Sequence, residues 1–283
     1  MRINSAKDDA AGLQIADRLT SQINGLNQGN RNASDGIALA QTMEAGMDEI
    51  SGMLQKVRTL AVQANNGTNT SDDRRAIGKE MEALVNEVNR IAQKTTFAGK
   101  TILNGQIAGS IFGDPAAAGG NTAPAGDAGT LTLQVGSNKG DTISFTSNSV
   151  MFSKIGSGDL MGDAADKVFK TSANGTITVT LTKAKTDTSA TSIAAIVELM
   201  DSMISKVDGA RADLGALQNR LESSIRNQSN VAANEADARS RIRDADFAEE
   251  SANLSQQSII QQAAASMLMQ ANTRPQLGLS LLG

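Results

Sequence analysis

Residues 10–64 read AAGLQIADRLTSQINGLNQGNRNASDGIALAQTMEAGMDEISGMLQKVRTLAVQA and contain no proline. Apolar residues recur there in steps of three and four, the spacing of a helix that packs lengthwise against another helix. The series is interrupted by polar Asn30 and by an extra step of three before Met43. Its apolar members are Leu19, Ile23, Leu26, Ala33, Ile37, Ala40, Met43, Met47, Ile50, Leu54, Val57 and Ala61. The stretch predicts one helix of roughly 80 Å at about 1.5 Å per residue, which needs a partner of similar length.

Local signals bound this helix and predict a second one. Ser5 with Asp8 three residues later predicts an N-cap of the capping-box type, and Asn65-Asn66-Gly67 predicts the C-terminal end. A second helix is expected from Ser71 to Lys94, with the 4-3-4-3 series Ile77, Met81, Leu84, Val88 and Ile91. The short connection predicts that it folds back along the first helix. Asn104-Gly105 then predicts a hairpin turn.

The periodicity changes between Gln106 and about Ala190. A Gly/Ala-rich link holds two of the three prolines, and segments with alternating apolar residues follow it. These segments contain Leu131, Leu133 and Val135, then Ile143 and Phe145, then Ile177, Val179 and Leu181. Alternation is typical of half-buried strands. Because four of the six Phe residues also lie here, we expect a small β-rich insert with its own core.

From Ser192 the helical spacing returns and predicts a second long rod. Its series is Ile193, Ile196, Met200, Met203, Val207, Ala210, Leu214, Leu217 and Leu221, continued more weakly by Gln228, Val231, Ala238 and Ile242. A last helix is expected from Phe247 to Asn272, ended by Pro275. Its apolar face comprises Leu254, Ile259, Ile260, Ala263, Met267, Leu268 and Ala271. This face has no evident partner in the chain, which indicates contact with another molecule.

The fold class that follows is mainly α with a β-rich insert: a long antiparallel bundle of coiled-coil rods, a small variable β domain and a C-terminal helix. We expect rod helices and a hairpin in 1–105, the insert in 106–191, the second rod in 192–243 and the C-terminal helix in 244–283.

Composition excludes several kinds of chemistry. The 283 residues include no His and no Cys, so imidazole acid–base catalysis, His-based zinc motifs, thiol chemistry and disulfides are unavailable. The net charge of −4 is mild and of mixed sign, and we expect no nucleic-acid partner. No apolar run is long enough to cross a membrane. We expect no catalytic residues, no metal and no cofactor.

Several stretches resemble bacterial flagellin. Two motifs near the N-terminus, Arg2-Ile3-Asn4-Ser5-Ala6-Lys7-Asp8-Asp9-Ala10-Ala11-Gly12 and Arg31-Asn32-Ala33-Ser34-Asp35-Gly36-Ile37, carry the resemblance. So do the segments 54–63, 96–99, 214–220, 240–247 and 267–282. These motifs cover both terminal thirds of the chain in the family's order. The middle matches poorly, as expected of the family's variable insert.

The resemblance implies a structural subunit that self-assembles into the extracellular flagellar filament for swimming motility and leaves by the flagellar type III route. Its implied partners are other subunits, the export chaperone and the cap protein. A flagellar hook–filament junction protein is the alternative, because it shares the terminal helices. A third class is an enzyme displayed on a flagellin scaffold. The zinc-protease version of that class is excluded by the absence of His.

Two sets of site residues follow from the resemblance. Lys56, Leu60, Gln63 and Glu80 match positions that would contact Toll-like receptor 5, although Lys56 and Thr59 replace the usual Arg and acidic residue. The same surface could instead serve subunit packing. The apolar face of 247–272 would pack in the filament core. Flagellins begin with a further helix before Arg2-Ile3-Asn4-Ser5, and we expect that helix to pair with 247–272.

Overall fold

The computed structural model describes residues 1–107, 109–113, 128–156, 168–171, 176–181 and 193–282, with side chains described from 195 to 271 in the last range. Its internal contacts divide the chain into two units. One comprises Leu26–Ser229, and the other combines Met1–Gly25 with Asn230–Gly283. Helices α1 (Ala10–Ala64) and α4 (Ile193–Arg243) contribute residues to both units.

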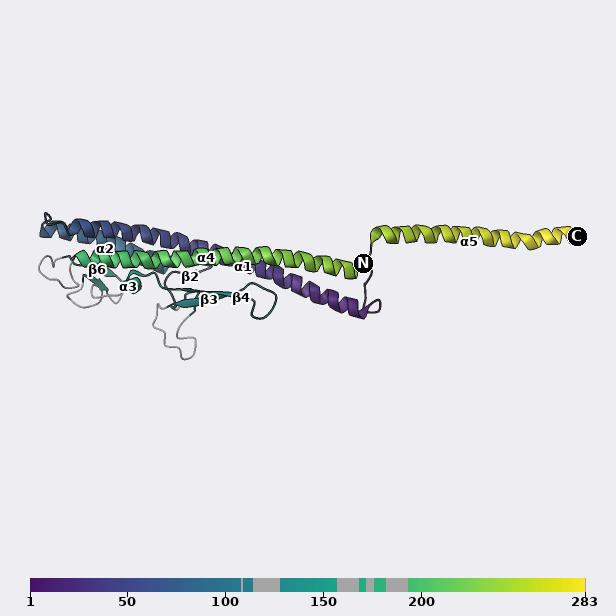
Figure 1. Ribbon diagram of the computed structural model, residues 1–283, viewed down its shortest axis with the longest axis horizontal. Coiled ribbons are helices and arrows are strands. Elements are labelled where there is room, and N and C mark those ends of the chain that lie inside the picture. Colours follow the sequence, from purple (N-terminus) through teal and green to yellow (C-terminus); the bar gives the residue numbers. More distant parts are fainter. Residues whose placement is uncertain (108, 114–127, 157–167, 172–175, 182–192, 283) are drawn as a thin grey trace. The chain divides into compact units, whose positions relative to one another are not determined.

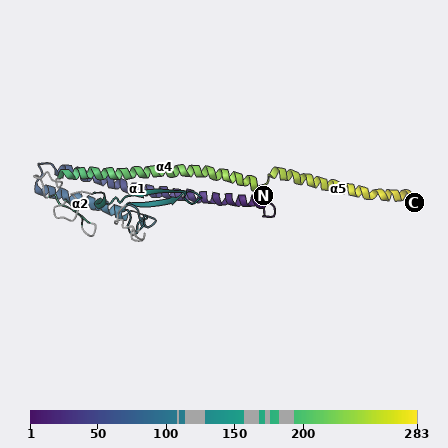
Figure 2. The ribbon, with the colours of Figure 1, turned by 60° about the horizontal axis from the view of Figure 1, so that its bottom comes forward.

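In the unit Leu26–Ser229, α1, α4 and α2 (Ser71–Lys94) run side by side, as both ribbon views show (Figures 1 and 2). Polar contacts between α1 and α4 fix their direction. Arg58 meets Asp201, Asp48 meets Arg211, and Glu44 accepts a hydrogen bond from Gln218. Residue numbers fall along α1 as they rise along α4, so the predicted antiparallel pairing is confirmed.

The α1–α2 connection is fixed by a capping box. The Thr70 hydroxyl accepts from the backbone N–H of Asp73 at 3.2 Å, and the Thr70 backbone N–H donates to the Asp73 carboxylate at 2.9 Å. Arg74 donates from Nε to the carbonyl of Ala64 at the end of α1. These bonds satisfy backbone groups that helix termini otherwise leave unpaired, and they turn α2 back along α1.

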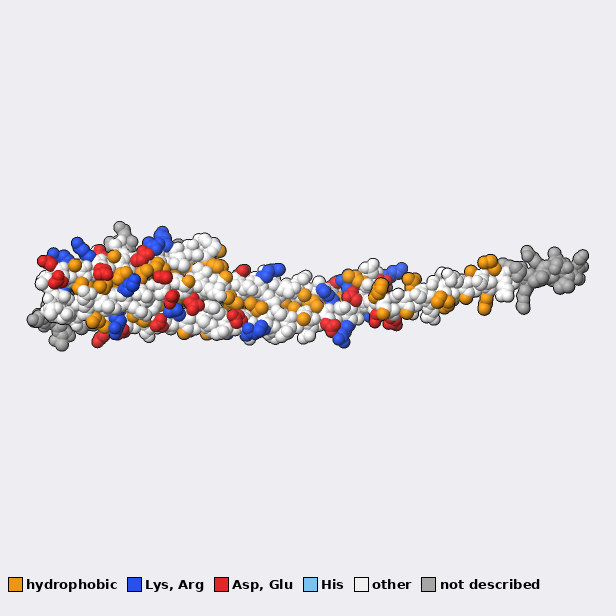
Figure 3. Space-filling view, turned by 90° about the horizontal axis from the view of Figure 1, so that it is seen from above, with side chains coloured by type: hydrophobic (Ala, Val, Ile, Leu, Met, Phe, Trp, Pro, Cys, Tyr) orange, Lys and Arg blue, Asp and Glu red, His pale blue; other side chains and the backbone are white. Residues whose placement is uncertain are grey.

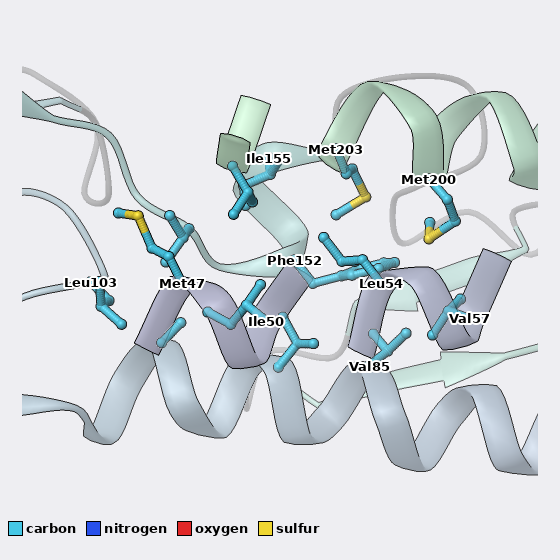
Figure 4. Packing of buried hydrophobic residues seen from close by; sticks show 14 of the residues in the cluster. Met47, Ile50, Leu54, Val57, Val85, Leu103, Phe152, Ile155, Met200 and Met203 are labelled. Carbon is cyan, nitrogen blue, oxygen red and sulfur yellow. The ribbon is translucent and has the colours of Figure 1, made fainter. Parts of the chain in front are cut away.

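The core lies along the three helices. The predicted series in α1, α2 and α4 supply Met43, Met47, Ile50, Leu54, Val57, Met81, Val88, Ile196, Met200, Met203, Val207, Leu214, Leu217 and Leu221, each at most 3 % exposed. Figure 4 shows Leu54 of α1 beside Phe152, with Met200 and Met203 facing them from α4. The series of α1 and α4 therefore face the other helices, as their spacing predicts. In α2 the predicted Leu84 and Ile91 are only half-buried, and their neighbours Val85 and Ala92 are buried instead.

The described residues between the rods form three separate two-stranded antiparallel sheets and a short helix. The strands pair as β1 (Thr96–Phe97) with β2 (Lys100–Thr101), β3 (Gly129–Gln134) with β4 (Thr142–Ser147), and β5 (Phe169–Thr171) with β6 (Ile177–Val179). Helix α3 spans Phe152–Ile155. The Gly/Ala-rich link at 114–127 lies outside the described residues.

The expectation that this segment has its own core is wrong. Its fully buried Phe152, Phe169 and Ile177 belong to the same apolar cluster as the helix series. Two asparagines of α2 also bind its backbone: Asn86 bonds to Ile177, and Asn89 accepts from the N–H of Phe152 at 2.9 Å. Two-stranded sheets of this size bury too little surface to be stable alone, so the strands use the helices as their second layer.

The predicted hairpin turn at Asn104-Gly105 is also wrong. The β1–β2 turn is formed by Ala98 and Gly99, whose φ angles of 50° and 80° suit a tight hairpin. Asn104 is instead buried, and its side chain accepts a hydrogen bond from the Thr101 hydroxyl at 3.0 Å. An Asn-Gly pair favours a hairpin only where its side chain has no competing local partner.

In the unit formed by the two chain ends, the N-cap of α1 differs from the prediction. Asp9, not Ser5, caps the helix, because its carboxylate accepts from the N–H of Gly12 at 2.9 Å. Asp8 accepts instead from the backbone N–H groups of Asn4 and Ser5, which lowers the pKa of its carboxyl. With two adjacent aspartates, the second one takes the cap and the first closes the preceding turn.

The extended segment before α1 contacts the end of α4. The backbone N–H groups of Arg2 and Ile3 both donate to the carbonyl of Arg243, and the Arg2 guanidinium donates to that of Ile242. These are two of the last carbonyls of α4, which have no partner within the helix. Ile3 is 2 % exposed, so the segment is packed as well as hydrogen-bonded.

Helix α5 (Phe247–Leu282) continues past Pro275, so the prediction that Pro275 ends it is wrong. Proline within a helix removes one backbone hydrogen bond and favours a kink, but it need not stop the helix when the flanking residues favour helix.

Candidate assembly and recognition surfaces

The predicted apolar face of α5 is exposed along its described length. Leu254 and Met267 are each 73 % exposed, and Ile260 is 51 % exposed. Ile259, Leu268, Ala263 and Ala271 are exposed as well. The space-filling view shows these orange side chains spaced along the helix (Figure 3). These exposed apolar side chains make α5 a candidate surface for contact with another molecule.

The apolar surface of α5 is broader than the sequence pattern indicated. Phe247 and Met269, absent from the predicted face, are 86 % and 69 % exposed. Met269 follows Ile260 by about two and a half turns, so the two point to opposite sides at about 3.6 residues per turn. A helix that is apolar on more than one side is suited to burial among several neighbours. Marking every apolar position, rather than one stripe, would have found both residues.

The predicted receptor residues lie at the α1–α2 end of the larger unit. Lys56 and Gln63 of α1 and Glu80 of α2 are exposed, whereas Leu60 is half-buried against the core. Lys56, Leu60 and Gln63 follow one another at steps of four and three, so they share one face of α1. Val62, 53 % exposed, adds an apolar side chain to this end that the sequence reasoning missed.

Arg58 is the other cation in this stretch of α1, and it is held in an ion pair. Its Nε and Nη2 donate to the two carboxylate oxygens of Asp201 at 2.5 and 3.2 Å. These hydrogen bonds and the opposite charge lower the pKa of the Asp201 carboxyl and raise that of Arg58. Among the described residues Lys56 has no such partner, so its ammonium is the cation that this surface offers to another molecule.

Among the described residues, no group of acidic side chains is arranged to hold a metal ion. No described helix has the length and apolarity needed to cross a bilayer.

Long antiparallel helices that carry a small β segment and end in an exposed apolar helix define a structural, assembly-type protein. The chain belongs to the bacterial flagellin family: the flagellin N-terminal helical region matches residues 1–108, and the flagellin C-terminal helical region matches residues 197–282. Members of this family are structural proteins of the extracellular flagellar filament and are not known as enzymes.

Individual relatives agree with the family assignment. The chain is 36 % identical to flagellin B of Vibrio cholerae, across 100 % of this chain and 90 % of that protein. It is also 36 % identical to a flagellin of Halalkalibacterium halodurans, across 100 % of this chain and 88 % of that protein. A Vibrio parahaemolyticus structure assigned as a flagellar hook-associated protein is similar in fold, with a TM-score of 0.60 and 15 % identity over 84 % of this chain and 100 % of that one.

Proposed function

We propose that this chain is a flagellin that self-assembles into the flagellar filament and thereby supports swimming motility. The observation that carries the proposal is the exposed apolar surface of α5, from Leu254 to Ala271. An isolated helix is marginal in water, and packing against neighbours supplies most of its stability. In a homopolymer, α5 helices of many subunits would bury this surface against one another or against another terminal helix of the family.

The assembly role of α5 is tested by placing a charge on its apolar side. Ile260→Glu should prevent incorporation into filaments, because a carboxylate without a partner would be buried in the packed helices. Gln257→Glu adds the same charge at a polar position one turn earlier and should leave incorporation intact. Incorporation is measured by sedimentation and electron microscopy of filaments from cells that produce each variant. Equal incorporation of both variants would contradict the assignment of the α5 surface.

The hook–filament junction protein remains the second candidate. The likeness in fold to the structure assigned as a flagellar hook-associated protein supports this candidate. The two roles differ in copy number and position. A filament subunit forms a homopolymer along the whole filament, whereas a junction protein is confined to its base.

The same proposal includes partners met before and during assembly. We expect export by the flagellar type III route, an export chaperone that covers the apolar side of α5, and addition of subunits beneath a cap protein. The exposure of Ile259, Ile260 and Met267 supports a chaperone, since such surface promotes aggregation when it is left uncovered.

Recognition by Toll-like receptor 5 through Lys56, Leu60, Gln63 and Glu80 is a further part of the proposal. Three of the four side chains are exposed, and the Lys56 ammonium has no ion-pair partner among the described residues. Gln63→Ala and Lys56→Ala should each reduce receptor signalling by the soluble monomer, while Lys79→Ala on α2 should not. Normal signalling by the first two variants, with impaired filament growth, would instead assign this surface to subunit packing.

A further inference from the structure

A cavity of about 730 Å³ opens beside β4 within the unit Leu26–Ser229. Its walls include α4 from Lys206 to Arg220, the β4 residues Ser144, Phe145, Thr146 and Ser147, and Lys154 of α3. None of the residues of β3 lines it, although every β3 residue belongs to the described part of the chain. The cavity therefore lies at the edge of β4 that faces away from β3, and its volume is typical of ligand sites.

The edge of β4 at this cavity carries backbone groups that β3 does not use. Just beyond the strands, the Val135 N–H donates to the Asp141 carbonyl at 2.9 Å, so the residues Val135 and Asp141 form a hydrogen-bonded pair of the antiparallel ladder. Hydrogen-bonded and non-hydrogen-bonded pairs alternate along such a ladder. By this alternation the backbone groups of Ile143 and Phe145 bond to β3, whereas those of Ser144 and Thr146 point away from β3. Ser144 and Thr146 are both exposed and both line the cavity.

The dimensions of the cavity suit one extended chain segment. Lys206 and Arg220 are separated by roughly 21 Å along α4, at about 1.5 Å per residue. On the opposite side the lining runs from Ser144 to Ser147 of β4 and on through Val150, and seven residues span at most about 24 Å at ~3.4 Å per residue. Gly209 also lines the cavity, and an added Cβ there would meet no atom within 4 Å. An extended segment of about six residues could therefore lie between α4 and this side of the cavity.

The charges around the cavity favour an acidic occupant. Lys206 and Lys154 lie toward one end, Arg220 lies at the other, and Asp213 is the single acidic residue of the lining. No ion pair joins any of the three cations to another described residue. Lys206 uses its ammonium to donate to the carbonyl of Ile155 at 2.8 Å, which holds that charge beside the cavity.

We propose that the edge of β4 that faces α4, and that no described strand pairs, binds an extended acidic peptide of about six residues as a third strand of the β3–β4 sheet. Backbone bonds to Ser144 and Thr146 would supply the strand pairing, and the three cations would select for Asp and Glu side chains. Strand addition to an exposed sheet edge is a recurrent mode of peptide recognition. The site is independent of α5 and does not require assembly, so it can be tested on the monomer.

The first test uses four synthetic probes with the full chain at low ionic strength. The parent peptide is Thr-Glu-Val-Glu-Thr-Glu with blocked ends and a fluorescent label, and binding is followed by anisotropy. Two further peptides have the same sequence with alternate backbone amides N-methylated, one peptide for each of the two registers. The fourth probe is an acidic oligosaccharide of similar charge. The proposal expects the parent peptide to bind, together with the N-methylated peptide whose methyl groups point away from β4. Binding of the other N-methylated peptide and of the oligosaccharide should be roughly tenfold or more weaker. Equal binding of both N-methylated peptides, or binding of the oligosaccharide as tight as that of the parent peptide, would overturn the proposal.

Variants then place the bound peptide. Gly209→Trp should fill the cavity and weaken peptide binding, whereas Gly215→Trp should not. Gly215 makes a matched control, because it lies on the same helix, has equally open space around its Cβ and does not line the cavity. Arg220→Glu should weaken binding as well, while Lys79→Glu, with the same change in net charge, should not. Unchanged binding by both cavity variants would overturn the proposal, and circular dichroism checks that each variant is folded.

Hydrogen exchange gives a readout specific to strand addition. Peptide binding should slow exchange of the Ser144 and Thr146 amides, which point outward, and leave the Ile143 and Phe145 amides, already bonded to β3, nearly unchanged. Binding without added protection at Ser144 and Thr146 would show that the peptide is held by charge alone, and the strand-addition proposal would fail.

Discussion

The side-chain amide of Asn86 pairs with the backbone of Ile177 through both of its polar atoms. The N–H of Ile177 donates to Asn86 Oδ1 at 2.9 Å, and Asn86 Nδ2 donates to the Ile177 carbonyl at 2.9 Å. The asparagine thus occupies the place of a neighbouring strand beside β6. Next to it, the N–H of Val179 donates to Glu82 at 3.2 Å. Helix α2 therefore holds the strand edge through its side chains.

Asn86→Ala should destabilise the unit Leu26–Ser229. Removing the amide leaves a partly buried N–H and a C=O of Ile177 without a partner, and each costs about 1–3 kcal/mol when it cannot reach water. The change is measured as the free energy of unfolding in urea. Asn219→Ala serves as the control, because Asn219 is an exposed helical asparagine. Equal stability of the two variants would show that the Asn86–Ile177 pair contributes nothing.

Two glycines of α1 should respond to alanine in opposite directions. A Cβ at Gly29 would overlap the carbonyl oxygen of Val135, a backbone atom that cannot move alone. Gly29→Ala should therefore destabilise by about 1–3 kcal/mol and displace the β3–β4 turn from α1. At Gly52 the space is open, so Gly52→Ala should stabilise by about 0.5–1 kcal/mol through helix propensity. Thermal midpoints of the two variants that shift in the same direction would contradict this packing.

Phe152→Ala tests whether the segment between the rods shares the helix core. Phe152 is fully buried against the helix series and Phe169, with ring centroids 5.0 Å apart. Its removal should cost about 3–5 kcal/mol and lower the midpoint of the helical far-UV signal. Phe247→Ala, at an exposed position on α5, should leave that midpoint unchanged. If Phe152→Ala left the midpoint of the helical far-UV signal unchanged, the segment between the rods would have a core separate from that of the helices.

The Arg58–Asp201 pair should make stability depend on acid pH. Hydrogen bonds from Arg58 hold the pKa of the Asp201 carboxyl below its ordinary range in the folded chain. Because the folded-state pKa is the lower one, the pair stabilises above the ordinary aspartate pKa, and this contribution is lost as pH falls through the lowered value. Asp201→Asn should thus be less stable than the parent near neutral pH and equal to it in strong acid. The mechanism would be contradicted if Asp201→Asn stayed less stable than the parent in strong acid. It would also be contradicted if Asp201→Asn cost as much stability in an Arg58→Gln background as in the parent.

The helical part of this fold could be predicted from sequence because its signals are long and repeated. Steps of three and four from Leu19 to Ala61 and from Ile196 to Leu221 leave one arrangement that buries both series. The start of α2 was predictable from the acidic residues of its first turn. The exposed face of α5 was also predictable, since no other apolar series in the chain remained to cover it.

The parts that sequence reasoning missed depend on contacts between distant residues. Alternation at Ile177 and Val179 predicts a strand but not what pairs with it, and nothing local identifies Asn86 as that partner. The choice of Asp9 over Ser5 as the N-cap and of Ala98-Gly99 over Asn104-Gly105 as the turn depends on hydrogen bonds of comparable strength. The cavity beside β4 needs α3 and α4 placed together. The division at residues 106, 192 and 244 stays a prediction.

The most direct measurement of the central claim is immunogold electron microscopy of flagella from the bacterium that makes this chain, with antibodies raised against the unit Leu26–Ser229. A self-assembling filament subunit predicts gold along the whole length of the filament. Gold confined to the filament base would assign the chain to the hook–filament junction, and unlabelled flagella on cells that produce the chain would contradict a flagellar structural role.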